Sequence, residues 1–237
     1  MEIELWSGQT KAIVDPLGAW LTNLSDDNGD ILFPRRLLKT VDGETKKRGG
    51  SHICLPNFGP GGDSGLVQHG FAREIEWTVG EKSDSTATLT LERGEGEYVD
   101  MSASLTYQLS DYALNVILEV KNNGDGDMRV APGFHPYFAV MGDGPVLLNG
   151  EKQELGELSV ARFIGGEEQK LAVSDRVVTL KSEQLTTWAE WTDLLGSYIC
   201  VEPTLKGFAF LNDKPAAEEL IVSGATKRYV FSIDWKA

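Results

Sequence analysis

The chain has little histidine, little cysteine and few basic residues. Its 237 residues include three histidines, two cysteines, and 22 Lys and Arg against 36 Asp and Glu, which gives a formal net charge of −14. So acidic a chain repels nucleic acid and anionic membranes, although an anionic metabolite can bind at a locally basic site. Cys54 and Cys200 lie in apolar runs, so we expect reduced, buried thiols in a cytoplasmic protein. A disulfide between Cys54 and Cys200 is an alternative only if the two runs lie next to each other in the fold.

Long apolar runs are also missing. No run approaches the roughly 20 residues that span a bilayer, and the acidic first residues show no basic, then apolar, leader pattern. We therefore expect no membrane partner. Hydrophobic residues still make up 41% of the chain, which is enough to build a core.

Helical periodicity is weak, and the dominant hydrophobic period is two. Alternating apolar residues over 87–91, 103–109 and 114–120 predict half-buried strands, with Ser110-Asp111 as a hairpin turn. Further strands are expected at 10–15, 19–24, 72–79, 128–132, 176–181, 187–191, 197–202, 207–211 and 227–235.

Only short helical turns are expected, at 160–163 and 214–220. Short strands with frequent turn signals predict an all-β sandwich or barrel, which we expect to form one domain over residues 1–237. Segment 40–70 is a long irregular stretch, and such loops are typically functional or disordered.

The three histidines, His52, His69 and His135, each lie in a segment rich in Gly, Pro and aromatic residues. Imidazole titrates near neutral pH, so histidines held in rigid segments favour acid–base chemistry. Zinc is a weaker alternative, because no His-x-x-x-His or Cys-x-x-Cys spacing occurs. We expect neither a metal ion nor a cofactor.

Two glycine-containing segments superficially resemble ligand loops. Segment 48–62 lacks the Gly-Lys-Ser/Thr ending and the helix of a nucleotide-binding loop. It is read first as a turn between strands, although the two histidines and two arginines of 48–73 favour an anion or sugar site. Segment 122–127 lacks the closing Glu of a calcium loop and is read as a hairpin turn.

Glu202 follows an apolar run, and we expect Pro203 to end the strand behind it. Acids at strand ends are usually solvated. If Glu202 is instead buried, its raised pKa suits a base that works near neutral pH. Trp188 and Trp191 are read either as core residues or as aromatic walls of a sugar site.

Six segments in order resemble the aldose 1-epimerase (mutarotase) superfamily, most closely its hexose-6-phosphate mutarotase branch. They are Arg-Gly-Gly at 48–50, Pro-x-Phe-Gly at 56–59, Gln-His-Gly-Phe-Ala-Arg at 68–73, Phe-His-Pro-Tyr-Phe at 134–138, Ser-Asp-Arg-Val at 174–177 and Cys-Val-Glu-Pro at 200–203. The resemblance implies a large antiparallel β-sandwich of the galactose mutarotase-like type with few short helices. It also implies a sugar or sugar phosphate as ligand, bound on the concave face. We expect a monomer or a homodimer.

The resemblance also implies roles for single residues. His135 corresponds to the general acid at the ring oxygen, Glu202 to the base at the anomeric hydroxyl, and His69 to a group that binds the ring side of the sugar. The expected reaction places acid and base on opposite sides of the ring, and each is typically worth about 10²- to 10⁴-fold in rate. Residues expected to bind substrate are Arg48, Arg73, Asp175 and Gln68, of which the two arginines are the candidates for a phosphate.

Two positions depart from the pattern. Pro136 stands where the phosphate-specific branch has Thr, which leaves the preference for a phosphorylated sugar open. His52 stands where Ile is usual, and we expect it to be structural.

Two other functions stay open at this stage. A non-catalytic sugar-binding or sensory domain would use the same scaffold, since fold does not fix function. A glycoside hydrolase needs two carboxylates about 5–10 Å apart. Glu202 and Asp175 are a conceivable pair, but no second acid lies in a comparable motif.

Overall fold

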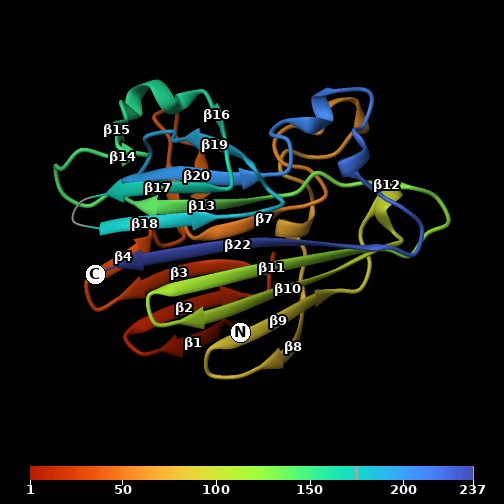
Figure 1. Cartoon of the computed structure of the whole chain (residues 1–237), viewed down its shortest axis with the longest axis horizontal. Coiled ribbons are helices and arrows are strands. Elements are labelled where there is room, and N and C mark those ends of the chain that lie inside the picture. Colours follow the sequence, from red (N-terminus) through yellow and green to blue (C-terminus); the bar gives the residue numbers. More distant parts are fainter. Residues whose placement is uncertain (174–175, 237) are drawn as a thin grey trace.

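Two antiparallel sheets of nine strands each face one another in the structure, a computed structural model that describes residues 1–173 and 176–236 (Figure 1). The first sheet has the order β1 (Ile3–Ser7), β2 (Thr10–Asp15), β3 (Trp20–Asp26), β4 (Gly29–Leu32), β13 (Gly133–Ala139), β20 (Tyr198–Thr204), β19 (Thr187–Trp191) and β16 (Arg162–Gly165), with β7 (Ser51–Cys54) paired to β13 and β3. The second has the order β15 (Glu151–Lys152), β14 (Leu147–Leu148), β17 (Glu168–Val173), β18 (Arg176–Lys181), β22 (Thr226–Lys236), β11 (Ala113–Asn122), β10 (Met101–Ser110), β9 (Thr86–Leu91) and β8 (Thr78–Lys82).

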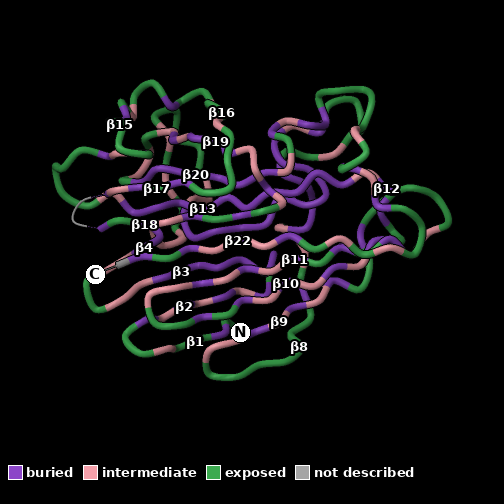
Figure 2. The backbone as a smooth tube through the Cα atoms, viewed as in Figure 1, coloured by how far each residue is buried: buried purple, intermediate pink, exposed green. Residues whose placement is uncertain are grey.

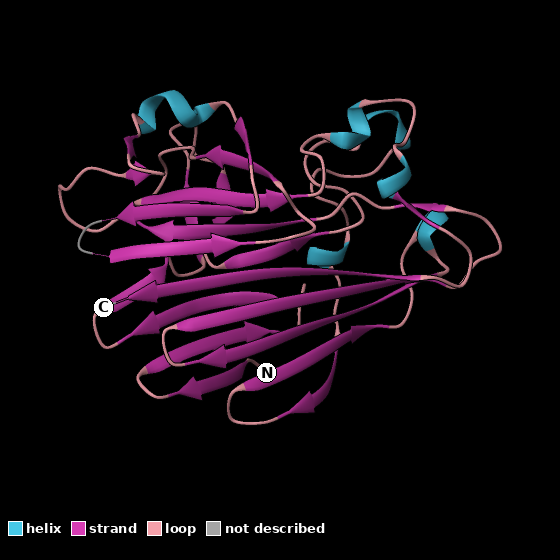
Figure 3. Cartoon of the chain, viewed as in Figure 1, coloured by secondary structure: helices cyan, strands magenta, loops and turns pink. Residues whose placement is uncertain are grey.

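Smaller elements lie outside the two sheets. Two further sheets have two strands each: the hairpin of β5 (Arg36–Lys39) and β6 (Thr45–Arg48), and the pair of β12 (Met128–Arg129) with β21 (Leu220–Ile221), which are distant in sequence. Among the described residues, helix occurs only as short 3₁₀ turns (Figure 3): η1 (Gly62–Ser64), η2 (Ala72–Glu74), η3 (Gly96–Tyr98), η4 (Leu155–Ser159), η5 (Ala209–Leu211) and η6 (Ala217–Glu219). None of these helices is long and apolar enough to cross a membrane.

The core lies between the two sheets and follows from the alternating sequence pattern. In β10 every second side chain is buried, because successive residues of a strand point to opposite faces (Figure 2). Leu105 is fully buried in this layer, and burying a side chain of that size contributes about 1.5–3 kcal/mol. The Tyr107 hydroxyl donates a hydrogen bond of 2.6 Å to the carbonyl of Ala19, which ties the two sheets together.

The structure confirms the predicted all-β antiparallel class and many of the strands. The strands expected at 10–15, 176–181 and 187–191 coincide with β2, β18 and β19. Segment 40–70 is irregular for the most part but also contains β6 and β7. The prediction of unpaired thiols is confirmed too, since Cys54 and Cys200 are free and buried, with β13 between their strands.

Two predicted strands are wrong because local hydrogen bonds fold the chain into turns. Segment 72–79 begins with η2, where the Trp77 indole donates to the Ala72 carbonyl at 2.9 Å, and β8 starts only at Thr78. Segment 207–211 holds η5, because the amide of Gly207, at φ 59°, donates to the Thr204 hydroxyl at 2.7 Å.

The turn predictions were partly right. Segment 160–163 is not helical: the helical turn η4 ends just before it, at Ser159, and β16 begins within it, at Arg162. Segment 214–220 does contain η6. The hairpin turn lies at Asp111-Tyr112 rather than at Ser110-Asp111, because Ser110 still pairs with Ala113.

Candidate active site

Two neighbouring strands of the first sheet, β13 and β20, carry the predicted site residues His135 and Glu202 on one face. In the register of β13, His135 is opposite His52 of β7, and Tyr137 is opposite Cys200 of β20. Side chains two residues apart share a face, so Glu202 lies on the same face as Cys200. The alternate residues of these strands, among them Ile53, Phe134 and Val201, belong to the core between the sheets.

This face forms the floor of a cavity of about 560 Å³. Six of the seven predicted site residues line it, namely Arg48, Gln68, His69, Arg73, His135 and Glu202. The seventh, Asp175, lies outside the described residues. The remaining lining residues are Trp20, Lys46, Lys47, Phe58, Glu74, Tyr137, Ala161, Trp191 and Phe208. The cavity therefore combines a histidine and a carboxylate on its floor with aromatic walls and a cluster of basic side chains.

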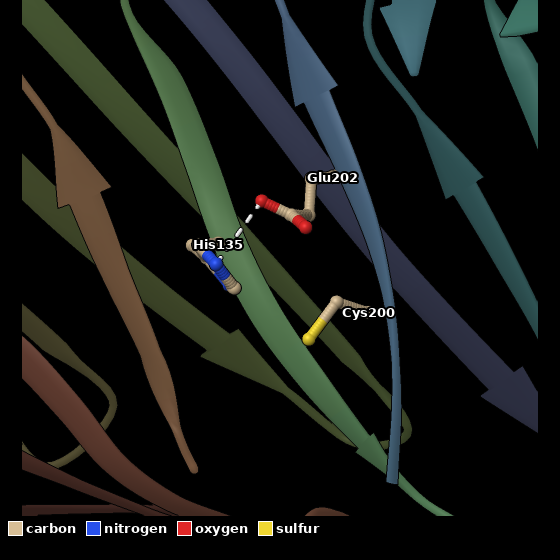
Figure 4. Close-up of side chains that lie close together, drawn as sticks. All are labelled: His135, Cys200 and Glu202. Atoms are coloured by element: carbon tan, nitrogen blue, oxygen red, sulfur yellow. Dashed lines mark ion pairs between the residues drawn. The ribbon is translucent and has the colours of Figure 1, made fainter. Parts of the chain in front are cut away.

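His135 and Glu202 form a close, buried pair (Figure 4). Nε2 of His135 lies 3.3 Å from Oε2 of Glu202, and the two residues are only 5% and 2% exposed. Burial raises the pKa of the Glu202 carboxyl well above its usual value, and burial, followed by the positive charge near His135, lowers the pKa of that imidazole. Each shift disfavours the charged form of its own residue. The pair as a whole is therefore most stable with one proton shared by its two members.

The strand around Glu202 differs from the prediction. We expected Pro203 to end the strand, but β20 continues to Thr204 and Pro203 stays in register with Trp188 of β19. Glu202 is therefore in the interior of a central strand, where neighbouring strands on both sides exclude water.

The separation of the pair also changes the expected geometry of the chemistry. Atoms 3.3 Å apart leave no room for a sugar ring between them, so in this arrangement both His135 and Glu202 face a ligand in the cavity from the same side. Because O1 and O5 of a pyranose are both bonded to C1, two adjacent groups are well suited to serve both oxygens.

His69 is held as a neutral hydrogen-bond donor. The backbone N–H of Gly59 donates to its Nδ1 at 3.2 Å, so Nδ1 is an acceptor and the ring hydrogen is on Nε2, which lies 3.3 Å from the side-chain amide of Gln68. The Cys54 thiol also contacts Nδ1 at 3.2 Å. Burial, together with the charges of Arg73 and Arg48, lowers the pKa of His69 to about 3. Its backbone has φ 64°, an unusual conformation for a residue other than Gly and one often found at functional sites.

His52 supports the cavity from below and is not part of its lining. Its ring packs between Trp20 and His135, with centroid distances of 4.5 and 4.7 Å. One guanidinium nitrogen of Arg73 lies 3.4 Å from Nε2 of His52, and since Arg can only donate, Nε2 is the acceptor. The hydrogen on Nδ1 then points to the carbonyl of Ile53 at 3.3 Å. His52 thus positions Arg73 within the cavity wall.

Asp193 was missed in the sequence. It accepts a hydrogen bond of 2.8 Å from Nε of Arg48, and a second one from the Tyr198 hydroxyl. Partial burial opposes its ionisation, but these hydrogen bonds outweigh it and lower the Asp193 pKa. An isolated Asp in the turn after β19 carries no motif, so only the fold reveals that it fixes Arg48.

Two lysines of the cavity were missed as well. Lys46 and Lys47 precede Arg48 on β6, whose pairing with β5 projects all three from a hairpin at the cavity rim. The ammonium group of Lys47 lies 5.1 Å from the ring centroid of Trp20 and 3.7 Å from Glu74. The Lys-Lys-Arg run in so acidic a chain was the available signal.

Residues 1–161 match the sequence profile of the aldose 1-epimerase family. The chain belongs to the aldose 1-epimerase family. Among curated relatives, it is similar to the putative glucose-6-phosphate 1-epimerases of Escherichia coli and Salmonella typhimurium, with 32% identity to each over 97 and 101 residues. Each match covers 39% of this chain and 33% of the relative, so the chain aligns with about a third of their length.

Solved structures show the same fold over the whole chain. A galactose mutarotase-like protein from Lactobacillus casei superposes with a TM-score of 0.81 at 20% identity, covering 100% of both chains. A putative aldose 1-epimerase from Escherichia coli superposes with a TM-score of 0.79 at 15% identity, covering 100% of this chain and 99% of that one. The fold of this aldose 1-epimerase family member is therefore galactose mutarotase-like, as the sequence resemblance implied.

The three buried histidines of this aldose 1-epimerase family member make its stability depend on pH. Burial lowers the pKa of all three below 6.5, so at lower pH the unfolded chain takes up protons that the folded chain does not. Stability is then lost as the pH falls below 6.5, by about 1.4 kcal/mol per pH unit for each uncompensated proton. Glu202 works in the opposite direction above pH 4.5 and offsets one of the three histidines. We expect the urea midpoint to fall between about pH 7.5 and about pH 5.5.

The matched variant for this titration is His52→Asn, which removes one buried imidazole and is expected to flatten the dependence. A urea midpoint that stays constant or increases as the pH is lowered from about 7.5 to about 5.5 would contradict buried, neutral histidines.

Proposed function

We propose that the protein is an aldose 1-epimerase that interconverts the α and β anomers of an aldohexose or, preferentially, of its 6-phosphate. The observation that carries the proposal is the buried pair of His135 and Glu202, 3.3 Å apart at the floor of the cavity. A cavity of about 560 Å³ is in the usual range for a small-molecule site and is large enough for a hexose phosphate.

Burial favours the single proton of the pair on Glu202, so the proposed reaction starts from the tautomer in which this proton has moved to His135. The Glu202 carboxylate removes the proton of the anomeric hydroxyl while the His135 imidazolium protonates O5 of the ring. The C1–O5 bond breaks, C1 and O1 form an aldehyde, and rotation about C1–C2 presents the other face of the carbonyl. Ring closure then returns one proton to O1 from Glu202 and takes the other from O5 to His135. No atom is gained or lost in the cycle.

The remaining side chains of the cavity are suited to holding the sugar in place. The Nε2–H of His69 is a neutral donor to a sugar oxygen, and its pKa of about 3 keeps the ring from taking up the catalytic proton. Trp191, whose ring centroid lies 5.8 Å from that of His135, presents an apolar surface to the C–H face of a pyranose. We assign the orientation of the ring to these two residues.

The basic rim supports the preference for a phosphorylated sugar. Lys46, Lys47, Arg48 and Arg73 line the cavity together with only two carboxylates, so a chain whose net charge is −14 has a local excess of basic side chains there. Arg48 and Arg73 are held in place by Asp193 and His52, which prepares their free N–H groups for an anion. The names of the curated relatives indicate the same substrate class.

The preference is tested with Arg48→Ala. We expect kcat/KM for glucose 6-phosphate to fall about 10- to 100-fold more than kcat/KM for glucose, because a hydrogen bond to a charged group is worth about 1.5–3 kcal/mol. Anomer exchange measured by NMR on both sugars gives the two values. Arg228→Ala is the matched control, since Arg228 does not line this cavity, and it should leave their ratio unchanged. Equal losses on both sugars would remove Arg48 from the phosphate role.

The activity itself is tested by anomer exchange on glucose, galactose and glucose 6-phosphate side by side. Faster exchange of at least one sugar than in buffer alone supports the epimerase. Calorimetric binding of a sugar without any acceleration would instead support the sugar-binding domain.

A further inference from the structure

Three different metal-binding side chains meet at the floor of the cavity: the imidazole of His135 and the carboxylate of Glu202, which line it, and the thiol of Cys200, which is fully buried beside them. One potential ligand atom from each lies within 4.8 Å of the other two. Cys200 and Glu202 project from the same face of β20 toward His135 on β13, as Figure 4 shows. The neighbouring strands of a sheet therefore hold the three donors together before any ligand arrives.

Two atoms of this group have no hydrogen-bond partner among the described residues. They are Nδ1 of His135 and Oε2 of Glu202, whose 3.3 Å contact with Nε2 of His135 is an ion-pair distance without hydrogen-bond geometry; the two residues are 5% and 2% exposed. Buried polar atoms are normally satisfied, so unpartnered atoms in two adjacent side chains indicate a place for a ligand. The proposed acid–base role accounts for one such atom on each residue when sugar is bound, but it does not use the thiol of Cys200.

The combination of donors selects a class of ion. Nitrogen, sulfur and oxygen ligands together suit Zn²⁺ and its thiophilic relatives, whereas Mg²⁺ and Ca²⁺ prefer oxygen alone. Zn–ligand bonds are about 2.0–2.3 Å long, and the 3.3 Å between Nε2 of His135 and Oε2 of Glu202 suits two ligands of one such ion. Three protein ligands leave a fourth position that faces the cavity. Binding displaces the thiol proton of Cys200 and any proton on Glu202 into solvent.

We propose that His135, Cys200 and Glu202 form a binding site for a thiophilic divalent cation of the zinc group, and that this cation inhibits the protein by occupying the acid–base pair. The binding site stands on the geometry of the three side chains, whereas its inhibitory effect rests on the proposed function.

The site is tested by titrating Cd²⁺ into the metal-free protein without sugar. We expect one ion per chain by calorimetry, and an ultraviolet charge-transfer band from a Cd–thiolate bond. Cys200→Ser should weaken binding by at least about 100-fold and abolish the band, since even an outer partner of a ligand is worth about 10- to 100-fold. Cys200→Ala serves the same purpose if serine packs poorly at this buried position.

Cys54→Ser is the matched control. Cys54 is also a buried, free thiol of the same sheet face, but it contacts His69 and is not part of the three-residue group. Its substitution should leave both the Cd²⁺ affinity and the band intact. The absence of stoichiometric binding, equal binding by Cys200→Ser, or loss of the band in Cys54→Ser would each overturn the site.

Inhibition is measured separately, as anomer exchange with increasing Zn²⁺, each variant normalised to its own metal-free rate. We expect the wild-type rate to fall with the occupancy found by calorimetry, and the Cys200→Ser rate to need at least about 100-fold more Zn²⁺ for the same fall. An exchange rate that persists at full occupancy would overturn the inhibitory role. If the metal-free protein accelerates no sugar at all, the proposed function fails while the binding result stands.

Discussion

Glu202→Gln is expected to lower kcat/KM for anomer exchange by about 10²- to 10⁴-fold, the usual contribution of a positioned general base. Glutamine has nearly the same shape as glutamate, so the cavity is preserved, but its amide cannot take the proton of the anomeric hydroxyl. Because burial raises the Glu202 pKa, the carboxyl costs stability above pH 4.5, and its replacement by a neutral amide should at the same time increase stability near neutral pH. NMR exchange spectroscopy on the preferred sugar measures the loss.

The control is Glu219→Gln. Glu219 is also buried, at 3% exposed, but it pairs with Arg129 and does not line the cavity. We expect it to reduce stability, because it weakens a buried ion pair, without a comparable loss in exchange rate. If Glu202→Gln retains the wild-type rate, or if both variants lose rate equally, Glu202 is not the base.

The sheets were predictable because their strands are amphipathic. A hydrophobic period of two over 103–109 and 114–120 indicates strands with one face packed on the core and the other facing solvent. The burial of β10 and β11 follows that pattern. The central strand β13 has no such alternation in its burial, since all its residues are buried, between the core on one side and the cavity on the other. Its place was indicated by the His-Pro-Tyr-Phe motif rather than by hydrophobic pattern.

The limits of prediction in the fold have local causes. Segment 72–79 has the composition of a strand, but a side-chain hydrogen bond from Trp77 closes a turn within it. Pro203 should end a strand by local rules, and the neighbouring strand β19 keeps it in the sheet. In both cases a contact beyond the immediate neighbours outweighed the preference of the residue itself.

In the candidate site, too, some residues were predictable from the sequence and others were not. Motifs selected His69, His135 and Glu202 from three distant parts of the chain, and the fold places them around one cavity. The roles of the supporting residues could not be predicted from the sequence, because Asp193 and His52 act only through the arginines that they hold. A positioning contact between residues 145 apart, as for Asp193 and Arg48, has no trace in sequence spacing.

His135→Asn is expected to lower kcat by about 10²- to 10⁴-fold while changing KM much less. The asparagine amide keeps a donor near the ring oxygen, but it cannot transfer a proton to O5 as the C1–O5 bond breaks. The sugar is held mainly by other groups in this proposal, namely His69, the aromatic walls and the basic rim. The effect should therefore fall on the chemical step, which progress curves over a range of sugar concentrations separate from binding.

His52→Asn is the matched variant for this experiment. Its imidazole lies 4.7 Å from that of His135 and is equally buried, but it is not part of the cavity lining. A substitution at His52 removes support for Arg73, so its effect should appear in KM for a phosphorylated sugar and spare the exchange of the neutral one. If His52→Asn and His135→Asn instead reduce kcat alike on both sugars, the loss comes from disturbed packing of the stacked rings. That outcome would contradict the role of His135 as the general acid. A decrease in kcat that is confined to the His135 variant would instead support His135 as the residue that protonates O5.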